Sequence, residues 1–211
     1  MNPHDSLRKI LGLYEHELNS WLDQALPRVG RVLDVGANDG YFTFGCAAAF
    51  ERLGKAGEII AFEPQARHAA QLLESTAAQP KSSVQIEIIE TFVGNELKPG
   101  MMTLDAVQSR FIGSNDRTAT LIKIDVEGAE VEVIEGGRSW LHPSNLFLIE
   151  VHDESFLNRL RAIFAERELR LLQINQRALP ILGRETRAES NWWLVTDLGA
   201  VSQSYTYRRR I

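Results

Sequence analysis

The chain has 211 residues, of which 44% are hydrophobic and 24% are charged, and these values fit one globular domain with one hydrophobic core. The formal net charge of -5 provides no extended basic surface for a phosphate backbone, so we expect no nucleic-acid partner. The single cysteine, Cys46, cannot form an internal disulfide, which favours a reducing compartment and a cytoplasmic protein.

The first predicted element is an amphipathic helix from Leu7 to Leu26. Apolar residues recur along it at three- and four-residue steps, and the pattern ends at Pro27. Charged residues interrupt the N-terminal region throughout, so the sequence predicts neither a signal peptide nor a membrane-spanning helix. We expect residues 1–30 to form a helical segment that packs on a single domain of residues 31–211.

Apolar runs and helical stretches then alternate along the chain. The sequence predicts strands at RVLDVG, EIIAFEP and VQIEIIETFVG, with helices at TFGCAAAFERL and ARHAAQLLESTAA between them. A short MTLDAV segment and a polar loop from Gln108 to Thr118 follow, and then the strand TLIKID, a helix from about Ala129 and the strand NLFLIEV. The helix SFLNRLRAIFAER precedes two final strands, Leu169 to Asn175 and Asn191 to Thr196.

These strands are apolar throughout and are separated by helices, which is typical of a mostly parallel sheet covered on both faces. Right-handed crossovers then produce a doubly wound, Rossmann-like α/β fold of about seven strands. No convincing helix separates the last two predicted strands. We therefore expect these two strands to pair antiparallel at one edge of the sheet.

A glycine turn follows the first predicted strand in VLDVGANDGYFTF. Gly36 and Gly40 let the backbone bend tightly and a ligand approach closely, and Asn38 tolerates left-handed backbone angles. Glu63 closes the next strand, 63 − 40 = 23 positions after Gly40, near the spacing of an acid that binds a ribose. These residues, with Tyr41 directly after the turn, predict a nucleoside site at the carboxyl ends of the first two strands.

The charge of this turn favours one kind of cofactor. Asp34 and Asp39 flank the turn, and no lysine or arginine lies between Arg31 and Arg52. Such anions disfavour the pyrophosphate of a dinucleotide, whereas S-adenosylmethionine carries a sulfonium and an ammonium group. We therefore predict S-adenosylmethionine as the cofactor and count Asp34 among its binding residues. The alternative is that Asp39 only caps the helix and Asp34 is a hydrogen-bonded core carboxylate.

Carboxylates crowd the segment LIKIDVEGAEVEVIEGG. Asp125 and Glu127 lie where a predicted strand ends, which is where doubly wound sheets bind ligands. At 100° per residue, Glu130 falls on the apolar side of the following helix and must find hydrogen-bond donors there. Glu132 and Glu135 fall on the opposite side, where we expect solvent. Asp125, Glu127 and Glu130 are therefore candidate site residues.

The next strand ends in LIEVHDE, and period-two alternation places Glu150 and His152 on one side of it. Asp125 is expected nearby, one strand over. His152 is the preferred general base for an acceptor hydroxyl, with Asp125, Glu127 or Glu150 orienting the imidazole or the acceptor. A divalent ion held by these carboxylates and His152 is an alternative that we do not favour, so no metal ligand is assigned.

The motifs VLDVGANDGYFTF, AFEP, the TLD of MTLDAV, IKIDVEGAEVEVIEGG and IEVH resemble, in this order, the FkbM-type family of S-adenosylmethionine-dependent O-methyltransferases. The resemblance covers about Arg31 to His152 and the closing strand NWWLVT, and KIDVEGAE is its most specific part. It implies a seven-stranded sheet with one antiparallel strand and methyl transfer to a hydroxyl. Implied cofactor contacts are Gly36, Asn38, Gly40 and Glu63, with Asp125 near the methionine end.

The predicted function is thus O-methylation of a small-molecule or saccharide acceptor, without a membrane partner. The N-terminal helix and the loop from Gln108 to Thr118 lie outside the motifs, and we expect them to shape the acceptor pocket. Two alternatives stay open: a nicotinamide-dependent oxidoreductase of the same fold, and a non-catalytic module that only binds a nucleoside. The oligomeric state is also open, with a homodimer among the options.

Overall fold

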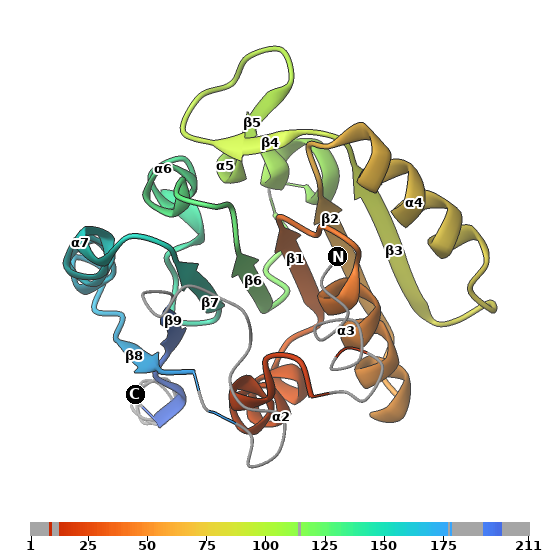
Figure 1. Ribbon diagram of the computed structural model, residues 1–211, viewed down its shortest axis with the longest axis horizontal. Helices are drawn as coiled ribbons and strands as arrows, with labels where there is room; N and C mark the ends of the chain where they lie inside the picture. The colour runs from red at the N-terminus through yellow and green to blue at the C-terminus, as the bar shows by residue number, and fades with distance from the viewer. Residues whose placement is uncertain (1–8, 10–12, 114, 177, 179–191, 200–211) are drawn as a thin grey trace.

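The computed structural model describes residues 9, 13–113, 115–176, 178 and 192–199. The apolar runs form one seven-stranded sheet in the order β3-β2-β1-β6-β7-β9-β8 (Figure 1). Its strands are β1 (Arg31–Val35), β2 (Gly57–Phe62), β3 (Val84–Ile89), β6 (Thr120–Ile124), β7 (Leu146–Val151), β8 (Leu171–Ile174) and β9 (Trp192–Thr196).

Neighbouring strands of this sheet are parallel except at β9, which runs antiparallel to both β7 and β8. The strand β8 lies at the edge of the sheet, and β9 is inserted between it and β7. The predicted doubly wound fold, with an antiparallel pair at one edge, is confirmed.

Helices cover both faces of the sheet (Figure 1). They are α2 (Asn19–Ala25), α3 (Tyr41–Arg52), α4 (Ala66–Ala77), α5 (Leu104–Val107), α6 (Glu130–Glu135) and α7 (Glu154–Ala165). Alternate residues of β1 point to opposite faces, so Leu33 packs in one hydrophobic cluster with side chains of α5, α6 and α7. Val32 packs in a second cluster with side chains of α2 and α3. The sheet is therefore buried on both faces, as its continuous apolar strands require.

The predicted N-terminal helix is interrupted within the described residues. Residues 1–8 and 10–12 of the expected stretch lie outside the described residues. A 3-10 turn, η1 (His16–Leu18), precedes α2, and a second one, η2 (Leu26–Arg28), follows it. Glu15 has a φ of 53°, a left-handed conformation that separates any preceding helix from η1. Trp21 of α2 donates a hydrogen bond from Nε1 to the carbonyl of Thr196, at 3.0 Å.

The predicted strand VQIEIIETFVG divides into two strands. β3 stays in the main sheet, whereas β4 (Phe92–Gly94) leaves it and pairs in parallel with β5 (Met101–Thr103). This second small sheet lies beyond the carboxyl ends of β1 and β2 (Figure 1). The predicted polar loop begins with one π-helical turn, η3 (Gln108–Ile112), directly after α5. A 3-10 turn, η4 (Arg138–Trp140), lies between α6 and β7. The division of the strand places β4 and β5 over the end of the sheet where a ligand is expected.

Candidate active site

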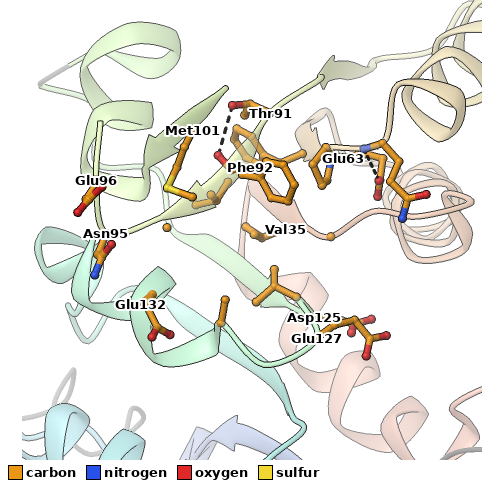
Figure 2. A pocket seen from close by; sticks show the side chains of 18 of the residues that line it. Val35, Glu63, Thr91, Phe92, Asn95, Glu96, Met101, Asp125, Glu127 and Glu132 are labelled. Atoms are coloured by element: carbon orange, nitrogen blue, oxygen red, sulfur yellow. Dashed lines mark hydrogen bonds between the residues drawn. The ribbon is translucent and has the colours of Figure 1, made fainter. Parts of the chain in front are cut away.

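A cavity of about 470 Å³ opens at the carboxyl ends of β1, β2 and β6. Gly36, Glu63 and Asp125 line it from the ends of these three strands. Figure 2 shows Phe92 and Met101 on the opposite wall, which the β4 and β5 pair supplies. The volume falls in the range of roughly 300 to 1,000 Å³ that is usual for small-molecule and cofactor sites.

The glycine turn brings two strand ends into close contact. Gly36 has a φ of +83°, and a Cβ on it would lie 1.8 Å from the carbonyl oxygen of Asp125. Asn38 has a φ of 50°, so it adopts the left-handed conformation that its residue type allows. Gly40, with a φ of +82°, starts α3 and packs against Leu72, but neither it nor Tyr41 lines the cavity. Only a residue without a side chain fits at position 36.

Glu63 is fixed from behind by two backbone amides. Its Oε2 accepts a hydrogen bond from the amide of Asn38 at 2.8 Å, and its Oε1 accepts one from the amide of Gln65 at 2.9 Å. The residue is 4% exposed and lines the cavity. Each carboxylate oxygen has further acceptor capacity, so the group can receive two neighbouring hydroxyls such as those of a ribose. The donor set therefore fits the nucleoside part of S-adenosylmethionine.

Asp34 lies beneath the turn and not in the cavity wall. It is 0% exposed, and its Oδ2 accepts a hydrogen bond from Thr43 Oγ1 at 2.6 Å. Burial raises the pKa of Asp34, and the ammonium of Lys123, 3.5 Å from Oδ1, opposes this shift. The position matches the alternative of a hydrogen-bonded core carboxylate. Any effect of Asp34 on a cofactor would act through Lys123.

Lys123 is the principal site residue that the sequence did not indicate. Its Nζ lies 3.0 Å from both the carbonyl oxygen of Gly36 and Oδ2 of Asp125. Burial opposes its charge, but Asp125 and Asp34 together raise the pKa of Lys123 above its usual value. On the other side of the turn, Lys9 Nζ lies 2.5 Å from Asp39 Oδ2. The turn is therefore less acidic than its own segment indicates, because cations reach it from other parts of the chain.

Five predicted site residues converge at the ends of β6 and β7 and the start of α6. His152 Nδ1 lies 2.7 Å from Oε1 of the fully buried Glu130. His152 Nε2 lies 3.4 Å from Glu127 Oε2 and 3.8 Å from Asp125 Oδ1. Ligand atoms of Asp125, Glu150 and His152 all lie within 4.8 Å of one another. The predicted juxtaposition of these two strand ends is thus present in the geometry.

The charges of this group act on one another. Burial disfavours the imidazolium of His152, but the hydrogen bond to Glu130 and the charges of Glu150, Glu130 and Glu127 outweigh burial and raise the pKa of His152 to about 9. Burial alone would raise the pKa of Asp125, yet Lys123, His152 and a hydrogen bond with Glu150 lower it. The ring thus carries a proton at neutral pH.

The positions of several other residues in or near the cavity were not predicted, or were predicted wrongly, from the sequence. Glu135 pairs with Arg159 at 2.6 Å, outside the cavity. Glu132, expected in solvent, lines the cavity (Figure 2), and its Oε2 is buried. Phe92 is 57% exposed, and it lines the cavity together with Met101. The signal that could have revealed this wall is the pair of glycines, Gly94 and Gly100, that frame a short polar turn between two apolar pairs, Phe92-Val93 and Met101-Met102.

The fold and the cavity at its strand ends define a class, the Rossmann-like methyltransferases. An FkbM methyltransferase from Methylobacillus flagellatus KT matches with a TM-score of 0.60 and 16% identity, over 81% of this chain and 44% of that one. A ribosomal protein L11 methylase from Lactobacillus delbrueckii subsp. bulgaricus matches with a TM-score of 0.52 and 14% identity, over 93% of this chain and 79% of that one. M. capricolum TrmK, solved with S-adenosylhomocysteine, matches with a TM-score of 0.50 and 14% identity, over 86% and 68%.

The family follows from the sequence match. Residues 67–171 match the model of the family described as "Methyltransferase FkbM domain". This range begins after the glycine turn and includes the strand ends that carry Asp125 and His152. The chain spans 44% of the length of the FkbM structure that it resembles. The curated proteins contain no match. Within the described residues, every helix is too short or too polar to cross a membrane.

Proposed function

We propose that this chain transfers a methyl group from S-adenosylmethionine to a hydroxyl oxygen of a small molecule or a saccharide. The observation that carries the proposal is Glu63, whose two carboxylate oxygens are held by backbone amides at the wall of the 470 Å³ cavity. When bound, the cofactor supplies a methyl group activated by its sulfonium. The chain has to align the acceptor oxygen with that group and exclude water.

The nucleoside end of the cavity has the chemistry that such a cofactor needs. Glu63 accepts hydrogen bonds from the ribose hydroxyls, and Gly36 lines the same end of the cavity. Phe92 and Met101 form an apolar wall against which a flat base can pack. Asn38, on the turn itself, offers an amide side chain at the same end.

The acceptor end has the groups for proton removal. A hydroxyl must lose its proton as the new bond from oxygen to carbon forms. His152 is the base that we propose, with Asp125 and Glu150 orienting the imidazole or the acceptor. The ring must first release its own proton, which can pass to solvent beside the exposed carboxylate of Glu127, 3.4 Å from Nε2.

Titration calorimetry on the purified full chain tests the cofactor. We expect S-adenosylhomocysteine to bind and NAD not to bind, which separates this function from a nicotinamide-dependent oxidoreductase. Glu63→Ala should weaken the binding at least tenfold, because it removes a charged hydrogen-bond acceptor worth about 1.5 to 3 kcal/mol. Glu87→Ala, on the exposed side of the neighbouring strand β3, is the matched control and should bind normally. Absence of S-adenosylhomocysteine binding by the folded chain would end the proposal.

Transfer of a labelled methyl group to a panel of saccharide and small-molecule hydroxyl acceptors tests the second half of the proposal. His152→Ala should lower turnover by at least about a hundredfold, which is the usual contribution of a general base, while S-adenosylhomocysteine binds as before. Unchanged turnover in this variant removes His152 from the mechanism. If the cofactor binds and no acceptor in the panel is methylated, a module that only binds the nucleoside explains the chain better.

A further inference from the structure

The side chains of Asp125, Glu150 and His152 meet beside the cavity, whose wall includes Asp125. Their ligand atoms, two carboxylate oxygens and one imidazole nitrogen, lie within 4.8 Å of one another. We propose that these three residues hold a divalent metal ion. Two donor atoms bound to one ion at about 2.3 Å can be separated by roughly 4.6 Å at most. Side-chain movements of a few tenths of an ångström therefore bring all three onto a common ion.

The orientation of the imidazole matches that of a metal ligand. His152 Nδ1 faces Glu130 Oε1 at 2.7 Å, so Nε2 is the nitrogen turned toward Asp125 and Glu127. Glu130 is itself held, because its Oε1 also accepts a hydrogen bond from the amide of Gly128 at 2.9 Å. Histidines that bind metals usually donate their other ring N–H to such a carboxylate, which fixes the tautomer and the ring.

Negative charge in this part of the site exceeds the positive charge that the described residues supply. Lys123 donates a hydrogen bond to Oδ2 of Asp125, and Oδ1 of the same carboxylate faces His152. Glu150 is 4% exposed, and one of its carboxylate oxygens lies within 4.8 Å of one of Asp125, so a cation between the two would offset the repulsion of their charges.

A separate observation concerns Glu130, which is 0% exposed. Its second oxygen, Oε2, has no hydrogen-bond partner among the described residues. A buried carboxylate oxygen left in this way is unfavourable unless a positive charge lies close to it. A divalent ion on Nε2 of His152 would make the ring a stronger donor at Nδ1, which faces Glu130 Oε1, and would in this way favour the negative charge of Glu130.

The ion would be reachable and would keep open positions. The Asp125 side chain is 23% exposed and lines the cavity, and the side chain of Glu127 beside it is 85% exposed. Three protein ligands leave room for water or for an acceptor oxygen, whose proton a metal makes easier to remove. With Nε2 of His152 bound to the ion, a neighbouring carboxylate such as Glu127, and not the imidazole, would receive this proton. This role in catalysis rests on the proposed function, whereas binding of the ion does not.

Mn²⁺ is the probe, and electron paramagnetic resonance of the full chain, stripped with EDTA and without cofactor, is the measurement. We expect saturable uptake of one ion per chain and a coupling from one imidazole nitrogen in the pulsed spectrum. Glu150→Gln and His152→Gln should each weaken the uptake at least tenfold, and the second variant should lose the nitrogen coupling. Glu135→Gln, whose carboxylate pairs with Arg159 outside the cavity, is the control and should bind as the parent chain does.

Failure to take up Mn²⁺ at millimolar concentration, or uptake without nitrogen coupling, overturns the proposal. The coupling is measured on the unaltered chain, so the result stands even if a variant does not fold. Uptake that neither Glu150→Gln nor His152→Gln changes also overturns it. Since no cofactor is present, this outcome is independent of the calorimetric test with S-adenosylhomocysteine.

Discussion

Replacing Gly36 by alanine should separate the first strand from its neighbour β6. The new Cβ would lie 1.8 Å from the carbonyl oxygen of Asp125, whereas a carbon and an oxygen in contact lie about 3.3 Å apart. The two strand ends must therefore move apart by roughly 1.5 Å. This movement breaks the 3.0 Å hydrogen bond from the Asp125 amide to Val35 and the 3.0 Å bond from Lys123 to the Gly36 carbonyl.

The free energy of unfolding should fall by about 4 to 6 kcal/mol. Left-handed backbone costs an L-residue about 1 to 2 kcal/mol, and the two hydrogen bonds contribute about 1 and about 1.5 to 3 kcal/mol. For a chain of this size, 1 kcal/mol shifts the melting temperature by about 2 to 4 °C. Circular dichroism should therefore record a fall of roughly 8 to 24 °C, and calorimetry should record weaker binding of S-adenosylhomocysteine.

Gly100→Ala is the matched control, because Gly100 has a φ of +76° and a Cβ on it would meet nothing within 4 Å. This variant has the strained left-handed backbone but no steric contact. Its free energy of unfolding should therefore fall by about 1 to 2 kcal/mol, and its melting temperature by roughly 2 to 8 °C. If Gly36→Ala melts no lower than Gly100→Ala, the close approach of the two strands is not what requires glycine, and the reasoning fails.

Two further predictions concern buried and surface charges. Lys123→Met should lower the stability measured in urea by about 3 to 5 kcal/mol, because the carboxylates of Asp34 and Asp125 lose their cation, and adding Asp34→Asn should restore part of it; no recovery in the double variant would contradict this pairing. A hydrogen bond from Arg31 lowers the pKa of Asp116 from its ordinary 3.8 to about 2, so the pair stabilises the fold above pH 3.8 and loses this effect as the pH falls through 2. Asp116→Asn should thus lower the free energy of unfolding by up to about 1 kcal/mol at pH 5 and by almost nothing at pH 2. A stability difference between the variant and the parent chain that persists at pH 2 would contradict this prediction.

The strands of the main sheet could be predicted because each is an apolar run bounded by turn residues. The division between β3 and β4 could not, since only Glu90 and Thr91 separate the two apolar runs and neither a glycine nor a proline marks the break. Similarly, the periodic pattern of the N-terminal region contains no signal for a left-handed residue at Glu15. In both places the backbone departs from the helix or strand that the sequence pattern predicts, and the sequence contains no local signal for this change.

The site divides in the same way. Glu63, Asp125 and His152 could be placed together because carboxyl ends of parallel strands meet at one edge of the sheet. The role of Lys123 could not be predicted, because it stands within an apolar strand and its partner Gly36 lies 87 positions away. For that reason the glycine turn, predicted to be acidic from Asp34 and Asp39, is less acidic in the structure. Local charge says little about a turn when a neighbouring strand supplies the counter-ion.

The insertion of β9 between β7 and β8 has a consequence during synthesis on the ribosome. Until Thr196 has emerged, the nascent chain exposes an unpaired edge on β7, whose side chains are fully buried in the finished sheet. Trp193, 1% exposed when folded, is also still absent from its hydrophobic cluster. Such open edges invite pairing with other chains, so translation that stops before residue 192 should yield an aggregating product.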